Sequence, residues 1–189
     1  ASTWSPAGWR REQRGRITDS VAGMCSDPFV PCDPMIPSSV AGMCSDPVIP
    51  AVPADRALVL DTNIVLDLFV FQDSATDALR HDLAQPDACW LATAAMREEL
   101  ARVLDYPQIA RRLLQQQLAP VEVLARFDAQ ARIVAVPAKA PVTCKDPDDQ
   151  KFIDLAVAHR ALLLSKDHAV LCMHKRLSAL GAQVRSTLH

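Results

Sequence analysis

The sequence contains no long uninterrupted apolar run, although half of its 189 residues are hydrophobic. No stretch approaches the roughly 18 uncharged apolar residues that a membrane-spanning helix needs, so we expect no transmembrane segment. The same hydrophobic content excludes a long disordered or fibrous chain, because such chains lack the apolar surface that offsets the entropy of ordering.

An excess of positive charge is also missing. The chain carries 20 Lys and Arg against 22 Asp and Glu, which gives a net charge of −2. A protein that follows long duplexes through phosphate contacts needs a basic surface, so this class is excluded. Any contact with nucleic acid is expected to be local, on a single-stranded or looped segment.

Cysteine and histidine do not occur at metal-ligand spacing. The six cysteines form no C-x-x-C pair and no cluster with histidine, which leaves a zinc site with weak support. Scattered, unpaired cysteines are typical of a reducing compartment, so we expect a cytoplasmic protein. The arginines at positions 10, 11, 14 and 16 precede no apolar core and no small-residue cleavage site, so we expect no secretory signal.

Residues 1–55 differ in composition from the rest of the chain. They hold eight of the fourteen prolines, which remove backbone N–H donors and disfavour both helices and sheets. The segment SVAGMCSDP at 20–28 recurs unchanged at 39–47, and two copies are too few for a repeat architecture, which needs about three. We therefore predict a disordered leader over 1–55 and one globular domain over 56–189.

Strands and helices are expected to alternate through the second part. Short apolar runs predict strands at 57–60, 88–92, 132–136, 161–164 and 183–185. A capping box at 74–77 predicts the start of one helix. Helical spacing and capping signals predict further helices over 93–104, 107–118, 121–131 and 169–180. Asp146, followed by Pro147 and two acids, predicts one more helix start. Such alternation gives crossover connections, so the expected fold class is α/β with a parallel sheet.

Acidic residues follow the ends of these predicted strands or open the neighbouring helices. Open parallel sheets bind ligands outside the carboxyl ends of their strands. The acids expected there are Asp61, Asp167, Glu98, Glu99, Asp148 and Asp149. An all-carboxylate set selects a hard cation such as Mg²⁺ or Mn²⁺, which also relieves the repulsion between the acids. A divalent ion in that place could activate water against a phosphodiester.

Each acid has a simpler explanation when it is taken alone. The acids at 146–149 suit an ordinary capped helix terminus, and Glu98 and Glu99 suit a solvated helix face. An Asp directly after a strand is a common turn residue. The prediction of a metal site therefore depends on all four groups of acids occurring together.

Four short motifs resemble those of the PIN domain family. Val-Leu-Asp-Thr-Asn-Ile at 59–64 resembles the first motif, and Glu-Glu-Leu at 98–100 resembles the central acid followed by leucine. Lys-Asp-Pro-Asp-Asp-Gln-Lys-Phe at 145–152 resembles the third motif, and Leu-Ser-Lys-Asp at 164–167 the fourth. The resemblance spans 57–187 and is nearest to bacterial PIN proteins described as toxin components of toxin–antitoxin pairs.

This resemblance implies a metal-dependent ribonuclease with a three-layer α/β/α fold and a parallel sheet of four or five strands. Its metal-binding and catalytic acids would be Asp61, Glu99, Asp149 and Asp167, with Glu98, Asp146 and Asp148 as alternates. Asn63 and Ser165 would orient the first and fourth acids by hydrogen bonds. The basic residues near the site that could contact RNA phosphate are Lys145, Lys151, Lys166, Arg56 and Arg160.

The resemblance also implies RNA as the substrate, an antitoxin protein as a partner, and a homodimer. Two other functions stay open. One is a Mg²⁺-dependent phosphatase or phospho-acceptor domain with Asp61 as nucleophile. Asn63 counts against this function, because a haloacid-dehalogenase-like enzyme carries Asp at that position. The other is a PIN-like domain that keeps its acids but acts only as a binding module.

Overall fold

The computed structural model describes residues 57–188, so the predicted leader at 1–55 lies outside the described residues. Five strands of this part pair in parallel in the order β3-β2-β1-β4-β5. They are β1 (Ala57–Leu60), β2 (Cys89–Ala92), β3 (Ala131–Ile133), β4 (Leu162–Leu164) and β5 (Gln183–Arg185). The predicted parallel sheet is confirmed.

The central strand β1 is buried along its whole length. Leu58 lies opposite Trp90 on one side and Leu162 on the other, so both edges of the strand are hydrogen-bonded. A parallel strand covered on both faces needs apolar side chains at consecutive positions, and the run Ala-Leu-Val-Leu satisfies this requirement.

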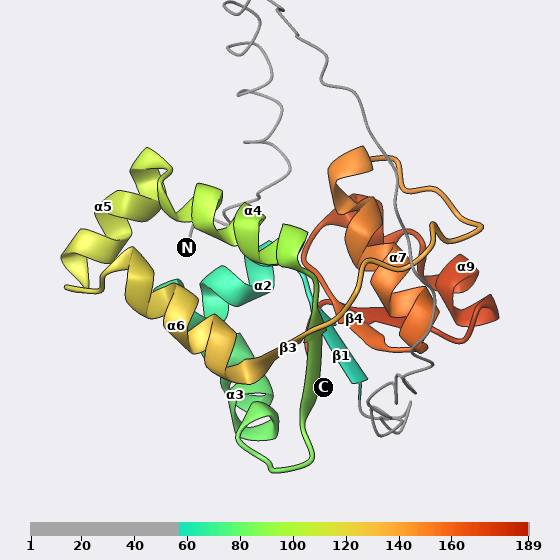
Figure 1. Cartoon of the computed structure of the whole chain (residues 1–189), viewed down its shortest axis with the longest axis horizontal. Coiled ribbons are helices and arrows are strands. Elements are labelled where there is room, and N and C mark those ends of the chain that lie inside the picture. Colours follow the sequence, from blue (N-terminus) through green and yellow to red (C-terminus); the bar gives the residue numbers. More distant parts are fainter. Residues whose placement is uncertain (1–56, 189) are drawn as a thin grey trace, which may run out of the picture. The chain divides into compact units, whose positions relative to one another are not determined.

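Helices cover both faces of the sheet, which confirms the three-layer α/β/α expectation (Figure 1). One layer holds α2 (Thr62–Leu66), α3 (Asp77–Leu83), α4 (Ala94–Leu104), α5 (Pro107–Gln115) and α6 (Pro120–Gln130). The other holds α7 (Gln150–His159), α8 (His168–Leu171) and α9 (His174–Ala179). The order of the strands explains this division, because right-handed crossovers from β1 to β3 and from β3 back to β4 place their helices on opposite faces.

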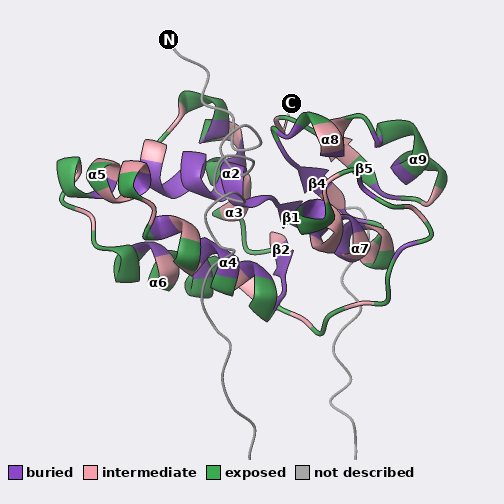
Figure 2. Cartoon of the chain, turned by 90° about the horizontal axis from the view of Figure 1, so that it is seen from above, coloured by how far each residue is buried: buried purple, intermediate pink, exposed green. Residues whose placement is uncertain are grey.

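The segment that leaves β1 forms a buried helix that the sequence patterns did not predict. Helix α2 continues directly into the π-helical turn η3 (Asp67–Phe71), and every residue from 62 to 70 is buried (Figure 2). A helix that is apolar on all sides has no 3.6-residue hydrophobic period, so periodicity cannot reveal it. Gln72 ends the helix in the left-handed region, with a φ of 51°.

Three predicted boundaries need correction. The capping box at 74–77 is wrong: the carboxylate of Asp73 caps a short turn, η4 (Ser74–Thr76), by accepting a hydrogen bond from the Ala75 amide at 3.0 Å. The predicted helix over 169–180 is interrupted between α8 and α9. The predicted strand at 132–136 covers Ala131–Ile133 instead, because its partner β2 ends at Ala92, whose carbonyl oxygen accepts the last hydrogen bond, from the Val134 amide at 2.8 Å.

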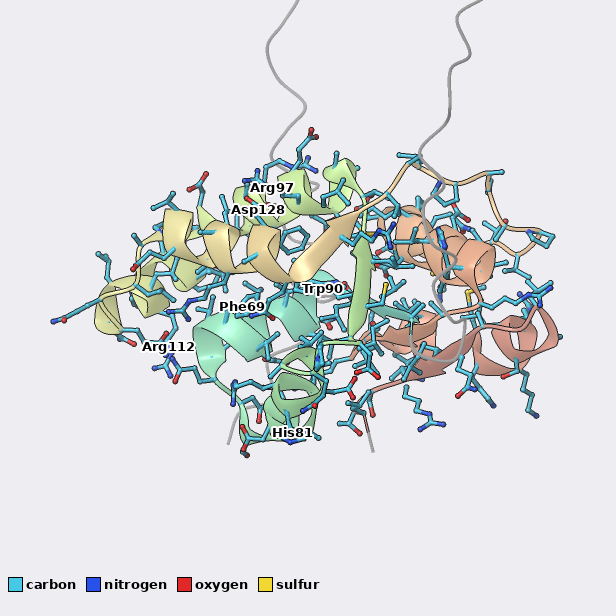
Figure 3. The ribbon with its side chains drawn as sticks, turned by 60° about the horizontal axis from the view of Figure 1, so that its bottom comes forward. Phe69, His81, Trp90, Arg97, Arg112 and Asp128 are labelled. Carbon is cyan, nitrogen blue, oxygen red and sulfur yellow. The ribbon has the colours of Figure 1, made fainter. Side chains whose placement is uncertain are left out.

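Aromatic packing fixes the helical layer that contains α4. The Trp90 ring lies between Phe69 of η3 and Phe127 of α6, with centroid distances of 6.3 and 4.8 Å (Figure 3). The contact with Phe127 is edge-to-face, a geometry that stabilises by about 0.5–1.5 kcal/mol beyond area burial. On the outside of the same layer, Arg97 donates two hydrogen bonds to Asp128, which joins α4 to α6. These contacts hold η3, α4 and α6 together and fix them against strand β2.

Within the described residues, no helix combines the length and the apolar content that crossing a membrane requires.

Candidate active site

The first and last of the predicted acids leave the carboxyl ends of two neighbouring strands. Asp61 follows β1, and Asp167 lies three residues beyond the end of β4. The Asp61 amide donates to the carbonyl oxygen of Leu164 at 3.0 Å, so the two chain segments emerge from the sheet side by side. This is the edge at which parallel α/β sheets bind their ligands.

The Asp61 carboxylate is completely buried and held by both predicted orienting residues. Its Oδ2 accepts hydrogen bonds from Asn63 Nδ2 at 2.7 Å and from Ser165 Oγ at 2.6 Å. The Ser165 hydroxyl in turn accepts a hydrogen bond from the Asp167 amide at 3.0 Å. One buried hydroxyl therefore connects the first acid to the backbone of the last acid.

Asp167 also caps a helix, besides lying at the candidate site. It is the N-cap of α8, and its Oδ1 accepts a hydrogen bond from the Ala169 amide at 2.7 Å. The cap keeps the carboxylate, which is 5% exposed, close to the end of β4. Its orientation is therefore set by the backbone of α8 as well as by Ser165.

The other two acids come from helices on opposite faces of the sheet. Glu99 lies in α4 and is buried, whereas its neighbour Glu98 is exposed. Asp149 ends the short turn η5 (Pro147–Asp149) before α7 and is buried, whereas Asp148 is exposed. Burial thus separates the preferred acids from these two alternates.

The third alternate, Asp146, acts as a cap. Its Oδ1 accepts a hydrogen bond from the Asp148 amide at 3.0 Å, as the sequence predicts for the start of this helical segment. The first turn is a 3₁₀ turn, and the α-helix begins only at Gln150.

The buried thiol of Cys144 feels the charge of several acids of this region. Burial raises the pKa of the Cys144 thiol, and the negative charges of Asp149, Asp146 and Asp167 raise it further. A hydrogen bond with the Asp146 backbone lowers the pKa of this thiol, and the charges of acids from η5 and from the β4–α8 connection both raise it. The raised pKa keeps this thiol protonated, which agrees with a site built from oxygen donors.

The donor chemistry of the four acids fits a hard divalent cation. Asp61, Glu99, Asp149 and Asp167 are each at most 8% exposed, and buried carboxylates need a countercharge. The acids are not assembled into a finished cage, however. Among residues 57–188, no three His, Cys, Asp or Glu side chains are grouped so that they could hold a metal ion.

Two of the three lysines expected to contact RNA are engaged with acids. The Lys151 ammonium forms an ion pair with Glu99. The Lys166 ammonium lies 2.7 Å from Asp67 Oδ2 and 3.1 Å from Asp73 Oδ2. Lys145 is exposed. Arg56 lies outside the described residues, and Arg160 is the exposed C-cap of α7.

Asp67 is a residue of this region that the sequence analysis missed. Burial raises the pKa of its carboxyl group, while the hydrogen bond and the charge of Lys166 act in the opposite direction. Its place in the sequence could have indicated it, because Asp67 is the single charged residue in the apolar run from 64 to 71. The pair with Lys166 joins η3 to the segment that carries Asp167.

The five-stranded parallel sheet with helices on both faces defines an α/β protein, and four predicted acids are buried in it. The family described as "PIN domain" matches residues 57–169, more than half of the chain, and the chain belongs to this family. The matched range includes all four predicted acids. PIN domains are generally nucleases that use divalent metal ions. A comparison with curated proteins gives no match.

Proposed function

We propose that the chain is a divalent-metal-dependent endoribonuclease that hydrolyses RNA phosphodiester bonds. Its metal-binding acids would be Asp61, Glu99, Asp149 and Asp167. The observation that carries the proposal is the linkage of Asp61 and Asp167 through the Ser165 hydroxyl at the carboxyl ends of adjacent strands. Membership of the PIN domain family supports the same reaction class.

A bound Mg²⁺ or Mn²⁺ would supply an activated water and would neutralise charge on the phosphodiester. The chain's own residues prepare the site for it. Asn63 and Ser165 both donate to Asp61 Oδ2, which fixes the plane of the carboxylate and therefore the direction of Oδ1. The cap on α8 fixes Asp167 in the same way. Lys145 is exposed on the loop before η5 and is the proposed contact for an RNA phosphate.

The test is cleavage of a fluorescent single-stranded RNA with Mg²⁺, with Mn²⁺ and with EDTA. We expect the wild type to cleave only with a divalent ion. Asp61→Asn should lower the cleavage rate at least about 100-fold, because losing a metal ligand costs more than losing a residue that orients one. Asp105→Asn, which removes the same charge from an exposed position after α4, should cleave at the wild-type rate.

Two results would overturn the proposal. Cleavage by Asp61→Asn at the wild-type rate would show that the metal assignment is wrong. RNA binding by the wild type without cleavage would instead assign the chain as a binding module.

An antitoxin that blocks the site and a homodimer are further proposals. They rest on the resemblance of the four motifs to PIN proteins of the toxin type. Phospho-acceptor chemistry at Asp61 has less support, because Asn63 occupies the position of the second acid and donates its amide to Asp61.

A further inference from the structure

Lys151 places a positive charge on one of the proposed metal-binding acids. It lies in the first turn of α7, and its ammonium forms an ion pair with Glu99 of α4, 52 positions earlier in the sequence. The ammonium also donates to the carbonyl oxygen of Asp148 and lies 4.8 Å from the centroid of the Phe152 ring. Three different groups therefore hold this cation at the edge of the site.

The pair is only partly accessible to water. The Lys151 side chain is 26% exposed and the Glu99 side chain 10%. Charges in such a position attract each other more strongly than a surface pair does, because less water screens them. The ammonium thus provides part of the countercharge that buried carboxylates require.

A divalent cation and this ammonium would need the same carboxylate. The two cations repel each other, so a divalent ion bound to Glu99 would weaken the ion pair with Lys151, and the ion pair would weaken binding of the divalent ion. Lysine can leave readily, because its charge is carried on a flexible four-carbon stem.

We propose that Lys151 competes with the divalent cation for Glu99 and so sets the metal concentration at which the site fills. The inference rests on the proposed metal-dependent function. Lys151 is here a positioning residue, because it acts through Glu99, and its contact with RNA stays a prediction.

The test is isothermal titration of the full chain with MnCl₂, which requires no substrate. We expect Lys151→Met to bind Mn²⁺ about tenfold more tightly than the wild type, a modest gain because the partial exposure of the pair screens its charges. Lys151→Arg keeps the charge and should stay within about threefold of the wild type. Lys139→Met removes the same charge from an exposed loop position and should leave the affinity unchanged.

A double variant separates competition from a general effect of charge. Glu99→Gln removes the carboxylate for which Lys151 and the divalent cation are proposed to compete. Adding Lys151→Met to this variant should therefore give no further gain in Mn²⁺ affinity. If Lys151→Met should fold poorly, Lys151→Gln provides the same comparison.

The outcomes distinguish this inference from the proposed function. If the wild type binds Mn²⁺ and Lys151→Met and Lys151→Gln bind it no more tightly, competition is refuted and the metal site stands. If no variant binds Mn²⁺ up to millimolar concentrations, the proposed metal site fails and the inference fails with it.

Discussion

Ser165 lies between the two acids that leave β1 and β4. Its hydroxyl donates to the Asp61 carboxylate and accepts from the Asp167 amide, so one small side chain sets the spacing of two proposed metal ligands. Alanine at this position would remove the hydrogen bond from the Ser165 hydroxyl to Asp61 Oδ2 and keep the one from Asn63 Nδ2. Groups that orient a metal ligand typically affect metal affinity by 10–100-fold.

We therefore expect Ser165→Ala to bind Mn²⁺ about 10–100-fold more weakly and to lose about 1–3 kcal/mol of unfolding free energy. Titration calorimetry and urea unfolding measure the two effects. Ser178→Ala removes an exposed hydroxyl from α9 and serves as the control. An unchanged Mn²⁺ affinity in a folded Ser165→Ala protein would show that the hydroxyl does not orient the acid.

Single residues also show what sequence reasoning can and cannot find at a site. The burial of Glu99 rather than Glu98, and of Asp149 rather than Asp148, follows the preference that accompanied the resemblance to the PIN motifs. The partners of Lys151 and Lys166 could not be predicted, because Glu99 and Asp67 approach them only through the tertiary fold. Proximity in sequence marks a lysine as near the site, but it does not say which acid the ammonium will contact.

At the scale of elements, the sheet and most helices follow from the sequence because each carries a local signal. Strand β5 has the predicted limits, and the Asp-Pro start of the α7 segment carries its predicted cap. The α2–η3 segment has no such signal, since burial on every side removes the polar face that periodicity detects. Its helical form is selected by packing against α4, α5 and α6.

Because α2 is buried on every side, substitutions of its apolar residues should lower the free energy of unfolding strongly. Leu66 is 1% exposed, and Leu66→Ala should lower the free energy of unfolding by about 2–5 kcal/mol, because the cavity can collapse only partly. Leu114 on α5 is 79% exposed, and the same change there should cost no more than about 0.5 kcal/mol. Urea unfolding of both variants tests this, and equal losses would mean that α2 is not part of the cooperative core.

At the scale of the whole molecule, the strands of the described part of the chain, 57–188, pair with one another in one sheet. Each strand pairs with another strand between residues 57 and 185, and the family match begins at residue 57. All four proposed acids lie in the same range. We therefore predict that residues 1–54 are not needed for the stability of the domain or for its proposed metal site.

Removal of residues 1–54 should consequently change the melting temperature by less than about 2 °C and leave the Mn²⁺ affinity unchanged. The matched control begins at residue 62 and loses β1 together with Asp61. It should not fold, because β1 is the central strand and its four apolar residues are buried between two neighbours and two helical layers. Circular dichroism melting and titration with MnCl₂ compare the two shortened chains with the full chain. A large loss of stability on removing only residues 1–54 would place part of the leader in the folded core, whereas a loss of Mn²⁺ affinity alone would place it at the acidic edge of the sheet.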